Sequence, residues 1–417
     1  MSLARYSFFL WAALIPFVSF SAEKGGGPKG LMSRFTAADV FGFLTILFSL
    51  PAGRWLRPNS FFPAMTAGAL LLVAAASSFL AILFSSSGEP LSGLLMPWLI
   101  FAFLVILSAR GSALLRSERD IVVLMTCVAI GGCLESFIVG HDLLSRLWGG
   151  AMWFRDPMDL RMRGTFRASG QLAQYGFVVG AVLFSLSAWP GKIRARTRLW
   201  WSVTAVFLML YPVFTTRRSG IVALVVLLVV WIALSQVYGS PDARKALPVL
   251  VPAGIFLCVY LAQAQYRDFL FGRVTSAQAN VASGESFLFQ QLWDAAESIS
   301  RNPVLGLGWG QSEGASRTGN EMHNAYLAVM VDSGLVGVLA FVAFIGSLLF
   351  WSWKLVRMTR HTPYFETALR FFAALTAQLV FWIHNRGLRD RGFFLFLAVF
   401  AACAHYIKIR RSEAPAR

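Results

Sequence analysis

Long apolar stretches, separated by polar connections, set the pattern of this chain. Twelve of them approach the ~20 residues that a helix needs to cross the hydrocarbon core of a bilayer. They are centred on residues 6–22, 35–52, 61–85, 91–109, 121–139, 169–189, 200–214, 219–238, 246–264, 326–350, 365–384 and 393–409. The pattern predicts an all-α, polytopic membrane protein of about 12 transmembrane helices, with residues 1–417 as a single integral membrane domain.

A signal peptide is the alternative interpretation of the first stretch. Only Arg5 precedes its apolar run, however, and Glu23-Lys24 followed by three glycines is a poor small-residue cleavage site. We therefore interpret this stretch as a membrane helix.

Composition agrees with a membrane protein. Hydrophobic residues make up 57% of the chain, charged residues 14%, and the mean hydropathy is +0.63, which excludes an ordinary soluble globule. Cys127, Cys133, Cys258 and Cys403 all fall inside predicted helices, so we expect no disulfide in the outer loops. The sequence has no metal-ligand spacing and no phosphate loop, so we predict no metal, no other cofactor and no nucleic-acid partner.

Basic residues concentrate in alternate connections. If the N-terminus is cytoplasmic, the inward connections are short and basic, as the positive-inside rule expects. They carry Arg54, Arg57, Arg110, Arg116, Arg119, Lys192, Arg194, Arg196, Arg198, Arg244, Lys245, Lys354, Arg357 and Arg360, and the tail adds Lys408, Arg410, Arg411 and Arg417. We therefore predict that both termini are cytoplasmic.

Two outward connections are long, residues 140–168 and residues 265–325. Long loops are uncommon unless they have a function, so we expect the chemistry on the outer side. After residue 34 every lysine falls on the proposed inner side, whereas the outer side has Arg146, Arg155, Arg161, Arg163, Arg167, Arg217, Arg218, Arg267, Arg273, Arg301, Arg317, Arg386, Arg389 and Arg391. Guanidinium groups make bidentate contacts with phosphate oxygens, so the bias favours recognition of a phosphate or diphosphate. The alternative is that these arginines contact lipid headgroups at helix ends.

Two short motifs contain the most informative outer arginines. Arg217 and Arg218 occupy T-T-R-R-S-G, a connection of a few residues between two apolar helices, where adjacent cations favour an anion. Arg163 and Arg167 lie in R-G-T-F-R-A-S-G, whose last residues open the next helix, and helix N-termini also favour anions.

A glycine-rich segment precedes the tenth predicted helix. Residues 287–300 predict an amphipathic helix on the outer surface, with Leu288, Leu292, Ala296 and Ile299 on one face. The chain then reads P-V-L-G-L-G-W-G, and His323-Asn324 follows shortly before the membrane helix. The position of His323 suits a base that meets a lipid-bound substrate, and a helix-start hydrogen-bonding role is the alternative.

These motifs carry a resemblance to a known family. P-V-L-G-L-G-W-G, followed by H-N-A-Y-L and D-S-G-L-V-G, resembles the signature of the bacterial O-antigen ligase and polymerase superfamily. H-N-x9-G-x-x-G is similar to the ligase motif in particular. The predicted helix number, the cytoplasmic termini and the large outer loop between the ninth and tenth helices agree with this resemblance.

The resemblance implies a GT-C-like glycosyltransferase of the bacterial inner membrane, with its active site at the periplasmic face. It would transfer an undecaprenyl-diphosphate-linked O-antigen glycan to a lipid A-core acceptor in lipopolysaccharide biosynthesis, in contact with membrane lipids. His323 matches the essential histidine, Arg218 matches the arginine that contacts the diphosphate, and Arg163 before G-T-F is a further match. We add Arg217, Arg167 and Arg301 as candidate diphosphate ligands.

One departure from the family pattern concerns the surface helix. The family often has a basic residue shortly before the tryptophan of this helix, but here Phe289 and Gln290 precede Trp293.

The chemistry implied by the resemblance suits these residue types. An acceptor hydroxyl attacks the anomeric carbon with inversion, and the lipid diphosphate leaves. Arginines stabilise the leaving charge without a metal, while His323 takes the hydroxyl proton. The carboxylate that orients this histidine is left open among Glu321, Asp332, Asp294 and Glu297. For other carboxylates, we expect Asp39, Glu135 and Glu366 to pair with other helices, and Glu366 to pair with Arg370.

Several other functions remain open. A repeat-unit polymerase or a protein O-oligosaccharyltransferase would use the same donor with a different acceptor. A lipid-glycan binding or flipping protein would need the arginines but not His323. A secondary transporter is the minor alternative, because the two halves of the sequence show no repeat.

Overall fold

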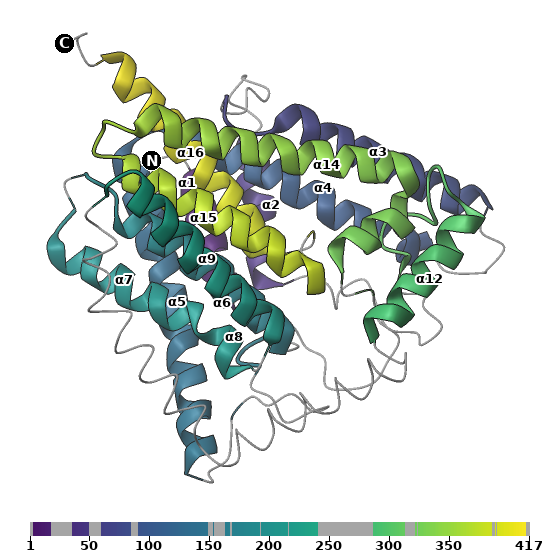
Figure 1. The fold of residues 1–417 in the computed structure, drawn as a ribbon, viewed down its shortest axis with the longest axis horizontal. Helices are drawn as coiled ribbons and strands as arrows, with labels where there is room; N and C mark the ends of the chain where they lie inside the picture. Colours follow the sequence, from purple (N-terminus) through teal and green to yellow (C-terminus); the bar gives the residue numbers. More distant parts are fainter. Residues whose placement is uncertain are drawn as a thin grey trace.

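The computed structural model describes most of the chain as a helical bundle (Figure 1). The described residues are 3–17, 36–49, 60–84, 91–148, 153, 163–166, 169–191, 193–215, 217–240, 287–312, 322, 324–385, 388 and 390–413. Their helices are α1 (Leu3–Leu14), α2 (Ala37–Ser49), α3 (Ala64–Phe84), α4 (Leu91–Leu114), α5 (Glu118–Leu147), α6 (Ser169–Ser187), α7 (Ala195–Met209), α8 (Tyr211–Phe214), α9 (Arg218–Val237), α12 (Phe287–Arg301), α14 (Ala325–Thr359), α15 (Phe365–Phe381), η3 (Trp382–His384) and α16 (Arg391–Glu413). No strand occurs among these residues.

The helices confirm a polytopic membrane protein. Within the described ranges, eight helical spans are long and apolar enough to cross a bilayer. Eleven of the twelve predicted stretches coincide with a helix, and the remaining one, 246–264, lies outside the described residues. The protein therefore builds its membrane domain from the apolar stretches that the sequence marks.

Two boundaries differ from the sequence prediction. α5 continues to Leu147, so residues 140–147 of the predicted loop 140–168 are helical. The stretch 200–214 divides into α7 and α8, because Pro212 has no amide proton with which to continue the hydrogen bonding of α7.

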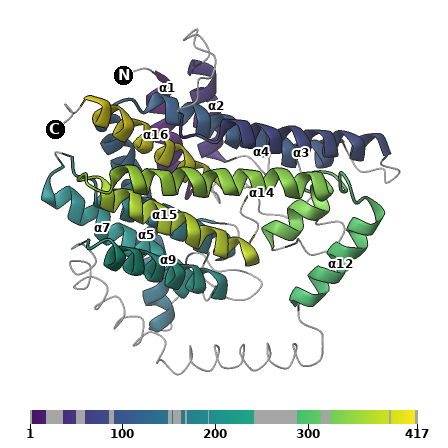
Figure 2. The same ribbon diagram turned by 45° about the horizontal axis from the view of Figure 1, so that its top comes forward.

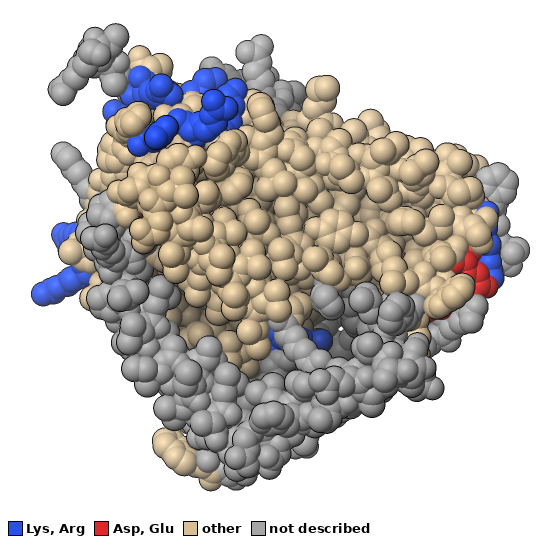
Figure 3. All heavy atoms as spheres, in the orientation of Figure 1, with Lys and Arg blue, Asp and Glu red and all other residues tan. Residues whose placement is uncertain are grey.

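Both termini lie at one end of the bundle (Figures 1 and 2). Contacts between distant segments define this end: Arg5 of α1 donates to Asp120 at 3.1 Å, and Tyr406 of α16 donates to Glu118 at 3.2 Å. The same end carries the exposed side chains of Arg116, Arg119, Arg194, Arg196, Lys354, Arg357, Arg360, Lys408, Arg410 and Arg411. We call it the basic end; most of the basic atoms visible in Figure 3 gather there.

The opposite end, here the far end, carries the starts of α6, α9 and α14 and the ends of α5 and α15. α6 is the most enclosed of the described spans, with nearly all of its residues buried, and it packs against α7, α15 and α16. α9 and α14 flank α15 on one face of the bundle (Figures 1 and 2). Loops at the far end are thus held by the helices that form the core.

A buried ion pair joins three of these helices. Glu366 and Arg370, one turn apart on α15, are 3.0 Å apart, as the sequence predicts. The Glu366 carboxylate also accepts from Trp231 of α9 at 2.5 Å, and Arg370 donates to the Phe184 carbonyl of α6 at 3.0 Å. Because the charges are shielded from water, each depends on its partners.

Replacement of Arg370 by Leu should destabilise the bundle strongly. It leaves the Glu366 carboxylate buried without its counter-ion, and breaking a buried pair in this way costs about 3–5 kcal/mol. Thermal unfolding of the detergent-solubilised protein measures the effect. The double variant Glu366→Leu/Arg370→Leu should be less destabilised than Arg370→Leu alone; equal or greater loss in the double variant would contradict this account.

Candidate functional site

A break in α14 shapes the far end of the molecule. At Gly334 the backbone has φ 60° and ψ −159°, so α14 consists of a short first segment and a long second segment. The first segment leaves the line of the long one and approaches α12 (Figure 2). The break falls in the D-S-G-L-V-G motif of the sequence.

The glycine-rich segment 303–308 pairs with four backbone groups that the break frees. In an unbroken helix Leu335 and Val336 would donate to the carbonyls of Val331 and Asp332. Here Leu307 and Gly308 donate to those two carbonyls, both at 2.9 Å. Leu335 and Val336 donate instead to the carbonyls of residues 303 and 304, at 2.9 and 3.2 Å. The break and the segment therefore form one unit, because an unpaired buried backbone group would be costly.

Two glycines permit this close approach. A Cβ atom on Gly334 would lie 2.5 Å from the carbonyl of Val304, and its backbone angles are open almost only to glycine. A Cβ atom on Gly306, where φ is 70°, would lie 2.5 Å from the carbonyl of Val331. The P-V-L-G motif is thus required to seat the segment against the broken helix.

Side-chain contacts extend the same unit. Asp332 accepts from the amide of Ser312 at 2.8 Å, and its own carbonyl accepts from the Ser77 hydroxyl at 2.5 Å. The amide of Trp309 donates to Ser78 of α3 at 3.2 Å. Asp332, one of the carboxylates left open in the sequence analysis for orienting His323, thus holds the chain just after the glycine-rich segment.

The start of α14 is anchored on both sides of His323, which itself lies outside the described residues. Met322 is fully buried in a small cluster with Ala295 of α12 and Val331 of α14. Asn324 caps α14, and its side-chain oxygen accepts from Tyr326 at 2.9 Å and Leu327 at 3.1 Å. The chain therefore passes residue 323 between two fixed neighbours.

α12 supports this anchor, and the predicted apolar face of this helix is divided between the Met322 cluster and the molecular surface. Leu292 and Ala296 are exposed, as is Trp293, whereas the half-buried Ile299 packs against the Met322 cluster. Leu288 lies outside the residues whose side chains are described. The buried face consists of small and polar residues, Gln291, Asp294, Ala295 and Ser298. The exposed tryptophan and leucine are typical of a helix that rests on a membrane surface.

Arg217 joins the starts of two membrane helices. It is the N-cap residue of α9, and its guanidinium donates to the Ser169 hydroxyl at 3.2 Å, in the first turn of α6. The guanidinium also packs on Gly170, where a Cβ atom would lie 3.1 Å from Nη2. The T-T-R-R-S-G and R-G-T-F-R-A-S-G motifs therefore meet in the folded protein.

Glu135 holds the turn that carries Arg163. Its carboxylate, fully buried in α5, accepts from the amide of Thr165 at 3.0 Å and from the Thr165 hydroxyl at 2.6 Å. Arg163 itself is half-buried, and its carbonyl accepts from the amide of Phe166 at 3.1 Å. We predicted that Glu135 pairs with another helix; in the structure it pairs instead with the loop residue Thr165.

The last turn of α15 brings the three helix starts together. Tyr326, in the first turn of α14, donates to the Leu379 carbonyl at 2.9 Å. The Phe381 ring lies 5.5 Å from the Phe177 ring of α6 and packs beside Gly220 in the first turn of α9. The amide groups that open α6 and α9, together with Arg217, therefore face one region of the far end, where they favour an anion. In the orientation of Figure 1, Figure 3 shows a few basic atoms near the start of α9.

The structure describes only some of the six predicted site residues, and not all of those lie at the far end. Arg217 contacts the segment that includes Arg163, so the structure brings these two motifs together. Arg218 is the first residue of α9, but its side chain is not among those described, and Arg167 and His323 lie outside the described residues. Arg301 is exposed on α12 and forms an ion pair with Glu297 at 2.6 Å, on a helix that lies away from α6 and α9 in both ribbon views.

Sequence reasoning missed one carboxylate at this end. Asp390 precedes α16, and burial raises the pKa of its carboxyl to about 6, although amide hydrogen bonds from Gly392 and Phe393 lower it. The side chain of Gln174, in the second turn of α6, lies beside it. The only sequence signal was an aspartate at a helix start. The neighbouring Arg391 pairs instead with Asp39 of α2 at 2.5 Å, so it ties two helices together.

The described residues contain no group of three or more His, Cys, Asp or Glu that could hold a metal ion. The far end contains Arg217, the N-termini of α6 and α9 and, beside them, the anchored residues Met322 and Asn324. Such an arrangement can bind an anion and stabilise negative charge that develops on it.

Comparison with known families supplies the deciding observation: residues 203–342 match the model of a family described as O-antigen ligase. Over these residues the chain is similar to the O-antigen ligase family. The matched region runs from α7 through the start of α9 and the glycine-rich segment to the middle of α14, and so includes Arg217 and the break at Gly334. No match to a curated protein accompanies it.

The similarity over residues 203–342 indicates a class of enzyme. Its members are glycosyltransferase-like enzymes, ligases and polymerases, and the family implies lipid-linked glycan substrates and contact with membrane lipids. The protein is thus a multi-pass membrane protein in which residues 203–342 are similar to this enzyme family.

Gly334→Ala tests the joint between the broken helix and its segment. The added methyl would meet the backbone of residues 304 and 305 and occupy a conformation that costs about 1–3 kcal/mol even without that clash. We expect a lower unfolding temperature in detergent and loss of transferase activity. Gly346→Ala, in the same helix with open space around it, should be neutral or stabilising. Similar behaviour of the two variants would show that the joint is not needed.

Proposed function

We propose that the protein is an O-antigen ligase. It transfers an undecaprenyl-diphosphate-linked O-antigen glycan to a lipid A-core acceptor, at the periplasmic face of the bacterial inner membrane. The observation that carries this proposal is the meeting of Arg217 with the first turn of α6, inside and beside the region that matches the family. In this assignment the basic end is cytoplasmic and the far end is periplasmic.

The diphosphate is the part of the donor that the far end would recognise. Arg217 and Arg218 would hold its oxygens at the membrane boundary, with Arg163 and Arg167 contributing from the neighbouring loop. The first-turn amides of α6 and α9 add partial positive charge in the same region. Arg301, which is paired with Glu297 on α12, is the weakest candidate of the set.

The reaction is a single displacement without a metal. The acceptor hydroxyl attacks the anomeric carbon while His323 takes the hydroxyl proton, and the bond to the lipid diphosphate breaks. Negative charge then grows on the leaving diphosphate, where preorganised guanidinium groups stabilise it more than they stabilise the substrate. One displacement inverts the configuration at the anomeric centre. The fixed positions of Met322 and Asn324 on either side support a base held in place.

Purified protein supplied with the lipid-diphosphate glycan and one acceptor at a time tests the assignment. We expect product with lipid A-core and none with a peptide. His323→Ala should reduce this transfer by about 10²–10⁴-fold, the usual contribution of a general base, while donor binding stays near normal.

His361→Ala, an exposed histidine at the basic end, is the matched control and should transfer normally. Elongation of a second lipid-linked glycan with no transfer to lipid A-core would identify a polymerase instead. Wild-type turnover in His323→Ala would remove this histidine from the mechanism.

Arg218→Lys tests recognition of the diphosphate. Lysine keeps the charge but loses the planar fork that contacts two oxygens, so we expect transfer to fall at least about tenfold with unchanged folding. Arg194→Lys, an exposed arginine at the basic end, should have no effect. The measurement is kcat/KM for the lipid-linked donor; equal values for Arg218→Lys and the wild type would argue against bidentate contact at this position.

A further inference from the structure

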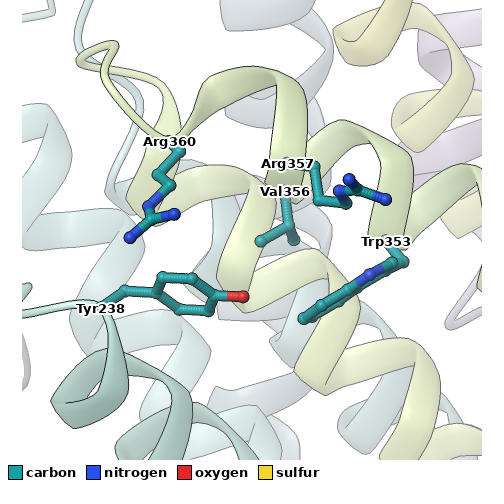
Figure 4. A pocket seen from close by; sticks show the side chains of 5 residues that line it. All are labelled: Tyr238, Trp353, Val356, Arg357 and Arg360. Atoms are coloured by element: carbon teal, nitrogen blue, oxygen red, sulfur yellow. The ribbon is translucent and has the colours of Figure 1, made fainter.

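A cavity at the basic end lies far from the proposed active site (Figure 4). It has a volume of about 420 Å³ and is lined by Tyr238, Trp353, Val356, Arg357 and Arg360. Tyr238 ends α9, and the other four residues belong to the end of α14. The volume is in the range of pockets that hold small ligands.

The lining is cationic and aromatic. In Figure 4 the Tyr238 hydroxyl points into the space between Arg360 and Trp353, while Arg357 lies on the side of Trp353. The Arg360 guanidinium lies 5.3 Å from the centre of the Tyr238 ring. Among the described residues, no carboxylate forms an ion pair with Arg357 or Arg360. Two arginines with no carboxylate partner in the described part of the chain, together with a nearby phenol hydroxyl, suit a phosphate group.

Lys354 does not contribute to anion binding in the cavity. Its ammonium group lies 4.8 Å from the Trp351 ring centre and 5.9 Å from that of Phe350, on the side chains preceding the cavity. Recognition of an anion in the cavity therefore falls to the two arginines, whose planar groups match phosphate oxygens better than an ammonium does.

The surroundings indicate that the phosphate belongs to a lipid. α9 and α14 flank α15, whose first residue, Phe365, stacks edge-on against Tyr238 with ring centres 5.5 Å apart. From the cavity toward the far end, exposed apolar side chains continue along both flanking helices: Val229, Ile232 and Val237 on α9, and Leu339, Val342 and Phe350 on α14. These surfaces would contact acyl chains, while Trp353 and Tyr238 are the residue types found at the level of lipid headgroups.

We propose that this cavity binds the headgroup phosphate of an anionic glycerophospholipid in the leaflet at the basic end. Basic pockets between membrane helices on the cytoplasmic side are suited to such headgroups. The bound lipid would bridge the ends of α9 and α14 over α15. The site is separate from the proposed transfer chemistry, and its existence does not depend on the identity of the glycan or the acceptor.

Native mass spectrometry of the delipidated full-length protein tests this site. Phosphatidylglycerol and phosphatidylethanolamine are added in turn, and the fraction of protein that retains one lipid is measured. We expect preferential retention of phosphatidylglycerol. Each arginine near a membrane surface contributes about fivefold to the affinity for an anionic lipid. The double variant Arg357→Gln/Arg360→Gln should therefore weaken phosphatidylglycerol binding about 25-fold.

Arg194→Gln/Arg196→Gln removes two exposed charges from the same end outside the cavity, and it should bind phosphatidylglycerol like the wild type. Arg357→Lys/Arg360→Lys preserves the charge and should retain part of the preference, so it carries the test if the glutamine variant fails to fold. Equal loss in the control pair, or no loss in Arg357→Gln/Arg360→Gln, would overturn the proposal. Displacement of the lipid by millimolar inorganic phosphate would also overturn it, since the cavity would then be a site for free anions.

Discussion

The pairing of residues 303–308 with the break in α14 is the constraint on which the far end depends. A membrane helix that breaks at Gly334 exposes two carbonyls and two amides in a place where water cannot reach them all. The glycine-rich segment takes all four, and this fixes the angle at which the first part of α14 leaves the bundle. That angle in turn sets where Tyr326 meets α15 and where the chain passes residue 323.

This joint connects two parts of the molecule that otherwise share few contacts. On one side are α12 and the Met322 cluster; on the other are α6 and α9 with Arg217 between them. The last turn of α15 links the two sides through Leu379 and Phe381. A catalyst that must bring a histidine and a diphosphate together needs such a link, because a displacement of about 1 Å can cost about 100-fold in rate.

The sequence predicted the membrane helices well because apolar length is a local property. It also predicted the Glu366–Arg370 pair, which lies within one helix. It identified the glycines of the P-V-L-G-L-G-W-G and D-S-G motifs but not their structural role. The pairing joins residues 24 or 32 positions apart and depends on a helix break that hydropathy does not reveal. The contact between Arg217 and Ser169, the role of Asp332 and the buried Asp390 are likewise products of tertiary packing. Packing also divides the predicted apolar face of α12, because Ile299 contacts the Met322 cluster whereas Leu292 is exposed.

The central claim is that the starts of α6, α9 and α14 surround the diphosphate of a lipid-linked donor. Photo-crosslinking with a donor analogue that carries the reactive group next to its diphosphate measures this directly, through the peptides that become labelled. The account predicts label in residues 163–176, 211–221 and 322–333. Label confined to the basic end, around Tyr238 and Arg357–Arg360, with none at the three helix starts, would contradict it.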